Sequence, residues 1–261
     1  MATSPTSPSV THPARRPLAV WLAGRIGWDA HAAMAERLAW EVSEPGGRPP
    51  TLVVSELEPA ITIGRLGSRA DVDLSADELR SQRLEIRFVG RGGGAVLHGP
   101  GQVFVSLFAA LDDLGLGRHD VGPYVARLEA GLEATLRRLG CDPWRRPGMH
   151  GLFGRTGMLA AVGVAVRRGV AGHGGFVNVC PALETFHRVR SAAVPREGEP
   201  STMASMGSVE AELRRKVRIQ DARTALVESI AAACGFQRTQ IQSGFPFVMH
   251  PAPPEYASRV G

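Results

Sequence analysis

The strongest constraint in this sequence is a glycine-rich segment in the first half of the chain, residues 91–102, which reads RGGGAVLHGPGQ. Five of its twelve residues are glycine, so the backbone can approach a bound group closely and offer it N–H groups. Apolar Ala95, Val96 and Leu97 are expected to lie inside the loop. No Lys-Ser/Thr pair follows and no GxGxxG opens a helix, which excludes the common nucleotide-binding loops. Taken alone, such a loop could equally be a plain turn.

Hydrophobic periodicity predicts alternating strands and helices around this loop. Strands are expected over Leu18–Leu22, Thr51–Leu57, Ala60–Gly64, Ile86–Val89, Val103–Ala109, Met158–Val166 and Phe176–Val179. Helices are expected over Ala30–Val42, after the capping box of Ser75 and Glu78, over Val121–Leu139 and over Val209–Ala233. The order lacks strict βαβ alternation and predicts an α+β fold, with a mixed sheet flanked by helices.

The chain divides into three parts by composition. Residues 1–16 are rich in Ser, Thr and Pro and are expected to be disordered. Residues 17–240 are expected to form one domain, and residues 241–261 a Pro-rich, irregular tail.

The charged residues are unevenly distributed in type. Net charge is +5, yet Lys216 is the single lysine in the chain. No basic run is interleaved with aromatic residues, which argues against nucleic acid as a partner. The three cysteines, Cys141, Cys180 and Cys234, are widely spaced, so neither a metal site nor a disulfide framework is expected. No apolar run is long enough to span a membrane, and we expect a cytoplasmic chain with free thiols.

The glycine-rich segment resembles the loop of the lipoate-protein ligase B family, the octanoyltransferases, which runs Arg-Gly-Gly, four variable residues, then His-Gly-Pro-Gly-Gln. Every fixed position is present without a gap. Three further segments resemble the family in the same order, namely Pro59–Gly64 with Thr62, Ala160–Gly163, and His173-Gly174 with Asn178-Val179 and Pro181. The resemblance spans about residues 18–235 and implies the fold of the biotin/lipoate ligase-transferase superfamily.

The resemblance also implies a set of residues that bind the acyl chain. They are Arg91, Gly92, Gly93, Gly94, Ala95, Val96, Leu97, His98, Gln102, Ala161, Val162, Gly163, Gly174, Gly175 and Phe176. Of these, His98 is expected to line the pocket or to support it, and Gln102 to orient the loop through its amide.

In the family, a cysteine carries the acyl group as a thioester and a nearby lysine lowers its pKa, since the thiolate is the nucleophile. Both residues are missing here. Met158 stands at the lysine position, and Ala192 aligns with the cysteine. Arg155 could supply charge but no base, and Ser191 lies one residue from the cysteine position without an evident base.

Two displaced nucleophiles are open alternatives. Cys180 could act with His173 as its base, because Cys180 lies two residues after Asn178 and would share its side of a strand. Cys141 is a weaker candidate, and a buried, inert thiol is the alternative for either cysteine. His150 and His187 are expected at the surface.

By resemblance, the expected activity is octanoyl transfer from acyl carrier protein to a lipoyl-domain lysine in lipoate biosynthesis, without a cofactor. The competing interpretation is a catalytically degenerate member, a pseudoenzyme, that binds octanoyl or lipoyl groups or their carrier domains without transfer. Basic residues crowd the first half of the last predicted helix, and they form either a solvated face or a docking face for an acidic carrier. They are Arg214, Arg215, Lys216, Arg218 and Arg223.

Overall fold

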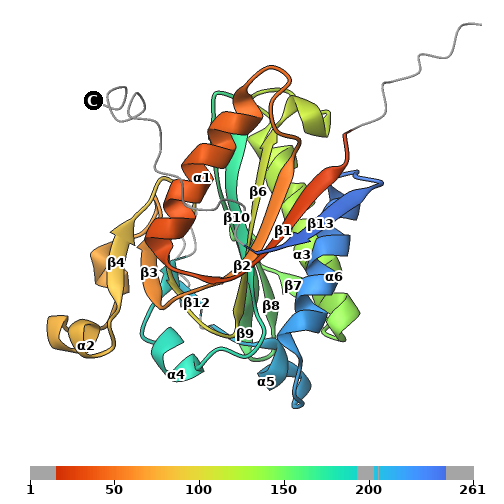
Figure 1. Ribbon diagram of the computed structural model, residues 1–261. Helices are drawn as coiled ribbons and strands as arrows, with labels where there is room; N and C mark the ends of the chain where they lie inside the picture. Colours follow the sequence, from red (N-terminus) through yellow and green to blue (C-terminus); the bar gives the residue numbers. More distant parts are fainter. Residues whose placement is uncertain (1–15, 193–202, 205, 245–261) are drawn as a thin grey trace, which may run out of the picture.

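The computed structural model describes residues 16–192, 203–204 and 206–244 (Figure 1). Nearly all of the segment expected to be disordered, and the tail from residue 245, lie outside the described residues. Within the described part, no helix is long and apolar enough to cross a membrane.

An eight-stranded sheet forms the centre of the domain, in the order β13-β1-β2-β6-β10-β9-β8-β7. Its strands are β1 Leu18–Ile26, β2 Thr51–Leu57, β6 Gln102–Ala110, β7 Trp144–Arg145, β8 Gly151–Gly154, β9 Gly157–Arg167, β10 Val170–Asn178 and β13 Thr239–Ser243. Strand β1 runs parallel to both of its neighbours, whereas the remaining pairs are antiparallel. The sheet is therefore mixed, which confirms the predicted α+β class.

Helices cover both faces of this sheet (Figure 1). On one face α1 (Trp28–Ser43) packs against β6 and β10, burying Met34 and Leu38. On the other face α3 (Val121–Leu139) and α6 (Ile219–Ala233) pack against each other and the sheet. Each helix presents one apolar stripe, so the two faces carry separate hydrophobic cores.

A smaller sheet of order β4-β3-β5 packs into the core on the α1 side. Its strands are β3 Ala60–Ile63, β4 Glu85–Phe88 and β5 Ala95–His98, and β11 (Ser191–Ala192) pairs separately with β12 (Met203–Ala204). Short helices complete the described chain: η1 Arg69–Asp71, α2 Ala76–Ser81, η2 Asp112–Leu114, α4 Leu183–Phe186 and α5 Val209–Leu213. The predicted capping box begins α2, with Ser75 and Glu78 bonded to each other's backbone N–H groups.

The apolar residues of the glycine-rich segment form a strand rather than a loop, which corrects the prediction. Strand β5 pairs antiparallel with β3, and Ala95, Val96 and Leu97 are buried in that ladder. Apolar side chains, among them the β-branched Val96, favour a short strand over a turn. The open part of the segment therefore shrinks to residues 91–94 and the turn at residues 99–101.

The helix predicted over residues 209–233 is two helices, α5 and α6. Arg214 ends α5 in the left-handed conformation, with φ of 52°, and Glu210 accepts a hydrogen bond from the backbone N–H of Val217. The tail prediction is wrong at its start, because Thr239–Ser243 forms β13 beside β1. Strand β10 begins six residues before the predicted Phe176, and the short strands β7 and β8 were missed.

The contact between α3 and α6 generates a stability prediction. A Cβ at Gly131 would lie 2.6 Å from Cδ1 and 3.1 Å from Cα of Ile230, whereas nothing lies within 4 Å of one at Gly122 of the same helix. Gly131→Val should lower the free energy of unfolding by about 1–3 kcal/mol through overpacking. Gly122→Val, the control, should change it by less than about 0.5 kcal/mol in urea unfolding. Equal effects of the two substitutions would refute this packing.

Candidate functional site: an apolar cavity at the glycine loop

Arg91 is the anchor of the glycine loop. Its side chain is 5% exposed, and burial lowers its pKa to about 10. The guanidinium donates to the carbonyls of Gly92, Gly94 and Thr62 at 2.9, 3.1 and 3.0 Å, and to the Thr62 hydroxyl at 2.7 Å. It makes no ion pair with any described residue. Carbonyl dipoles therefore stabilise this buried cation and, in return, it fixes the course of the loop.

Backbone hydrogen bonds then hold the loop between two strands. The N–H groups of residues 64–66 donate to loop carbonyls, and Gly92 donates to the carbonyl of Val164 on β9 at 2.9 Å. This approach needs glycine, because a Cβ at Gly64 would lie 2.4 Å from the Gly93 carbonyl oxygen. In the described structure no hydrogen bond uses the N–H of Gly93 or Gly94, so these two donors are available to a ligand.

A chain of buried polar side chains continues from Arg91 under the loop. The Thr62 hydroxyl lies 2.9 Å from Nε2 of His98, whose Nδ1 lies 2.7 Å from Oε1 of Gln102. Gln102 donates to Oδ1 of Asn178 at 2.9 Å, and Asn178 donates to the carbonyl of Met158 at 3.2 Å. The chain ties the loop to β6, β10 and β9.

The direction of these bonds fixes the protonation of His98. The amide nitrogen of Gln102 is already a donor, so its oxygen must accept the proton on Nδ1 of His98. Nε2 then accepts from the Thr62 hydroxyl. Burial and the charge of Arg91 lower the pKa of His98 to about 3, which keeps the ring neutral. His98 is thus a fixed structural dipole beneath the loop.

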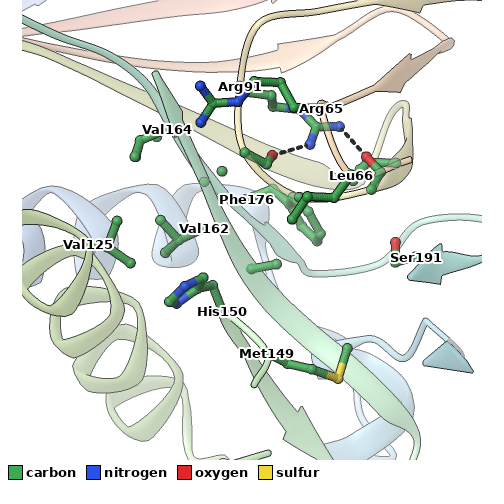
Figure 2. A pocket seen from close by; sticks show the side chains of 18 of the residues that line it. Arg65, Leu66, Arg91, Val125, Met149, His150, Val162, Val164, Phe176 and Ser191 are labelled. Carbon is green, nitrogen blue, oxygen red and sulfur yellow. Dashed lines mark hydrogen bonds between the residues drawn. The ribbon is translucent and has the colours of Figure 1, made fainter. Parts of the chain in front are cut away.

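A cavity of about 390 Å³ opens beside the loop. It forms at the exposed edge of β9, because β8 covers that edge only as far as Ala161. Valines from β9 and α3 line one side of the cavity. Phe104, Met158 and Phe176 also line it, and they belong to the core on the opposite face of the sheet. In Figure 2, Val125, Val162 and Val164 lie across the cavity from Leu66 and Ser191. Among the described residues, no Asp or Glu lines it.

Most of the sequence-predicted binding residues line this cavity. They are Arg91, Gly92, Gly93, Gly94, Val96, His98, Ala161, Val162, Gly163, Gly174, Gly175 and Phe176. Ala95, Leu97 and Gln102 do not line it, since they support it through the β5 ladder and the polar chain. Sequence reasoning missed Arg65, Leu66, Phe104, Val121, Val125, Met149 and His150 as lining residues. Arg65 and Leu66 directly follow Gly64, the last residue of the Pro59–Gly64 motif, and this position next to the motif could have marked them as lining residues.

None of the three cysteines lines the cavity. Cys141 and Cys234 are buried in the core beneath α3 and α6, and Cys180 packs against the same core. Burial raises the pKa of Cys180, and Glu210 and Glu56 raise it further, so its thiolate is disfavoured. Burial likewise raises the pKa of Cys141 to about 11.

The structure does not bring Cys180 and His173 together. Strand β10 carries the chain roughly 16 Å from His173 to Asn178, and Cys180 lies two residues beyond the end of that strand. His173 lies near His31, Arg91 and Arg167 instead, while the charged neighbours of Cys180 are Glu56, Glu210 and Lys216. The hypothesis that His173 is the base for Cys180 therefore lacks the required geometry.

Of the two positions where the sequence resemblance placed the missing lysine and cysteine, Met158 lines the cavity and is buried. Ala192 pairs with Met203 in the β11–β12 ladder. Ser191, one residue before it, also lines the cavity, but its hydroxyl donates to the carbonyl of Ala95 at 2.7 Å. No histidine is hydrogen-bonded to Ser191, so nothing in the described structure activates it as a nucleophile.

Comparison with known proteins agrees with this arrangement. A model of the lipoyl protein ligase A/B catalytic domain matches residues 29–231. An octanoyltransferase of Geobacter sulfurreducens is 33% identical over 199 residues, which cover 76% of this chain and 77% of that protein.

Solved structures show the same fold at low identity. A putative lipoate protein ligase from T. acidophilum with bound lipoic acid superposes with a TM-score of 0.66 and 16% identity, covering 88% of this chain and 91% of that one. A bi-partite lipoate protein ligase from Thermoplasma acidophilum, described with its E2 lipoyl domain, gives a TM-score of 0.63 and 15% identity, covering 88% of each chain.

The class of fold is thus that of the lipoate protein ligases, as the sequence predicted. The chain belongs to the lipoyl protein ligase A/B catalytic-domain family, whose curated relatives include octanoyltransferases.

The buried histidines beside the cavity predict how stability depends on pH. Burial, with His173 and His98 nearby, lowers the pKa of His31 to about 3 from 6.5. Between these pH values the unfolded state binds the proton and the folded state does not, so stability falls as pH falls. In urea unfolding between about pH 6 and 4, His31→Gln should reduce the slope of stability against pH by up to about 1.4 kcal/mol per unit. An unchanged slope would contradict the buried, neutral state of His31.

Proposed function

We propose that this chain binds an octanoyl or lipoyl group in the cavity and forms no cysteine thioester with it. The observation that carries the proposal is an apolar cavity of about 390 Å³ beside the glycine loop, with no cysteine and no lysine in its lining. Its volume falls within the roughly 300–1,000 Å³ of small-molecule pockets. The valines around β9 suit the hydrocarbon chain.

The polar end of the cavity suits an acyl carbonyl. The N–H groups of Gly93 and Gly94 make no hydrogen bond in the described structure, and the buried Arg91 guanidinium donates to the carbonyls of Gly92 and Gly94 in the same loop. Preorganised N–H groups next to a cation stabilise negative charge on a carbonyl oxygen. The loop therefore orients a thioester or amide carbonyl, even though no cysteine or lysine lies in the cavity lining.

The positions of the thiols and of the single lysine argue against a cysteine thioester. All three cysteines are described, and each lies outside the cavity lining. Lys216, the single lysine, is on the connection between α5 and α6, where it pairs with Glu210 at 3.3 Å. This supports the interpretation of a catalytically degenerate member that binds acyl groups or their carriers.

A second candidate is octanoyl transfer without an enzyme-bound intermediate, which the octanoyltransferase relatives favour. In that reaction a lipoyl-domain lysine attacks the thioester carbonyl on acyl carrier protein. The new C–N bond forms as the C–S bond breaks, and the departing thiolate takes up the proton that the amine loses. Either candidate would place the chain in protein lipoylation, as a protein of the cytoplasm.

The test is mass spectrometry of the chain with octanoyl-acyl carrier protein. Denatured chain should carry no octanoyl adduct, because no thiol reaches the cavity. Native spectra with a small octanoyl thioester should show a non-covalent complex. An octanoyl adduct that disappears in Cys180→Ala would contradict the proposal. Octanoyl amide on an added lipoyl domain, without an adduct on this chain, would select direct transfer over binding alone.

A pair of substitutions on β9 tests where the octanoyl group binds. Ala161 lines the cavity and Ala165 does not, although both lie on the same side of the strand. Ala161→Leu should fill the cavity and weaken octanoyl thioester binding by about tenfold or more, a loss of about 1.4 kcal/mol. Ala165→Leu should bind as the wild type does. Equal affinities for the two variants would place the ligand elsewhere.

A further inference from the structure

Four exposed arginines stand around the entrance of the cavity. Arg65 lines the entrance itself, and its backbone N–H donates to the carbonyl of Arg91. Arg167 follows the lining residue Val166, and its Nη2 atom lies beside Gly90 at the start of the loop. Arg118 donates to the carbonyl of Arg168 at 3.0 Å, which joins the segment before α3 to the β9–β10 turn.

None of these four guanidinium groups forms an ion pair with a described residue, whereas many other arginines do. Most of the basic residues predicted as a docking face on the last helix are already held in ion pairs or hydrogen bonds. Arg223 pairs with Glu56 at 2.8 Å, Arg218 with Asp221 at 2.9 Å and Lys216 with Glu210 at 3.3 Å. Arg215 donates to the carbonyl of Leu139. The four arginines at the entrance are therefore without ion pairs in the described structure, whereas most of the basic residues around α6 are already bonded.

Apolar side chains occupy the space between these charges. Leu66 is 55% exposed and Val121 is 38% exposed, although both line the cavity. Asp112, Asp113 and Asp120 lie on the segment that leads to α3, and none of them makes an ion pair with the four arginines. Apolar residues within a polar, charged rim are the usual composition of a transient protein interface.

We propose that Arg65, Arg118, Arg167 and Arg168 form a docking surface for an acidic protein domain that presents an acyl group on a flexible arm. The proposal rests on the function proposed above, because the arm must deliver its acyl chain into the cavity. Charge complementarity selects the partner: unpaired guanidinium groups attract carboxylates on an approaching surface and speed its association. The cavity entrance lies within this surface, so docking aligns the arm with the glycine loop.

The test compares two charge-reversal variants that alter net charge equally. Arg118→Glu/Arg167→Glu changes the docking surface and spares the cavity lining. The control, Arg83→Glu/Arg238→Glu, changes two exposed arginines without ion pairs, one at the end of β4 away from Gly90 and one beside the opposite edge strand β13. Affinity for octanoyl-acyl carrier protein should fall by about tenfold or more at low ionic strength in the first variant only. Added salt should narrow that difference.

A small octanoyl thioester separates docking from the cavity. Both variants should bind octanoyl-N-acetylcysteamine as the wild type does. Loss of carrier binding in the control variant as well, or no loss in either, would overturn the docking surface while leaving the cavity intact. Failure of the wild type to bind the small thioester would instead refute the proposed function.

Binding of acyl carrier protein that lacks its phosphopantetheine arm shows whether the arginines contact acidic side chains or the phosphate of the arm. If the arm-less carrier still binds more weakly to Arg118→Glu/Arg167→Glu, the contact is with acidic side chains, as proposed. If only carriers with the arm distinguish the variants, the arginines bind the phosphate of the arm, and the acidic surface is refuted. Tighter binding of a short RNA than of the carrier to the same arginines would also overturn the proposal.

Discussion

The buried guanidinium of Arg91 is the interaction on which the site depends. A cation this deeply buried is costly unless polar groups compensate it. Here three carbonyls and the Thr62 hydroxyl do so. Because two of those carbonyls belong to Gly92 and Gly94, satisfying the charge also folds the loop over β3. Burial, together with the same charge, lowers the pKa of His98 and keeps its ring neutral, and His98 fixes Gln102 and Asn178 in turn.

This arrangement separates binding from chemistry. The loop, the polar chain beneath it and the apolar walls form a complete acyl-sized cavity. Met158 and Ala192, where the sequence resemblance placed the missing lysine and cysteine, lie in the cavity lining and in the β11–β12 ladder beside Ser191. The parts proposed to hold a carbonyl consist of backbone N–H groups and one buried cation, so they do not depend on a nucleophile. On the function proposed above, the chain keeps the binding half of an acyl-transfer site.

Local sequence patterns predicted well those helices whose apolar residues recur with a strong helical period. Val121–Leu139 has the predicted bounds because its apolar stripe and Gly140 mark both the face and the end of the helix. The break at Arg214 was not predictable from periodicity, since it depends on Glu210 accepting from Val217 and on contacts with the end of α3. Likewise β5 depends on its long-range ladder with β3, which a local reading of a glycine-rich segment does not show.

The site could be predicted only where a motif marked the sequence. The glycine segment and the two strand motifs located most of one wall, but Val125 and His150 reach the cavity through tertiary packing alone. The proposed pairing of Cys180 with His173 relied on closeness in sequence. It failed because an extended strand carries neighbouring residues apart rather than together.

Nuclear Overhauser contacts from a ¹³C-labelled octanoyl thioester, bound to the full chain, test the central claim most directly. We expect contacts from the terminal methyl group to the methyl groups of Val125 or Val162, together with shifts of the Gly93 and Gly94 amide protons. Contacts confined to residues outside the cavity, or unchanged Gly93 and Gly94 amides with the ligand bound, would contradict the account.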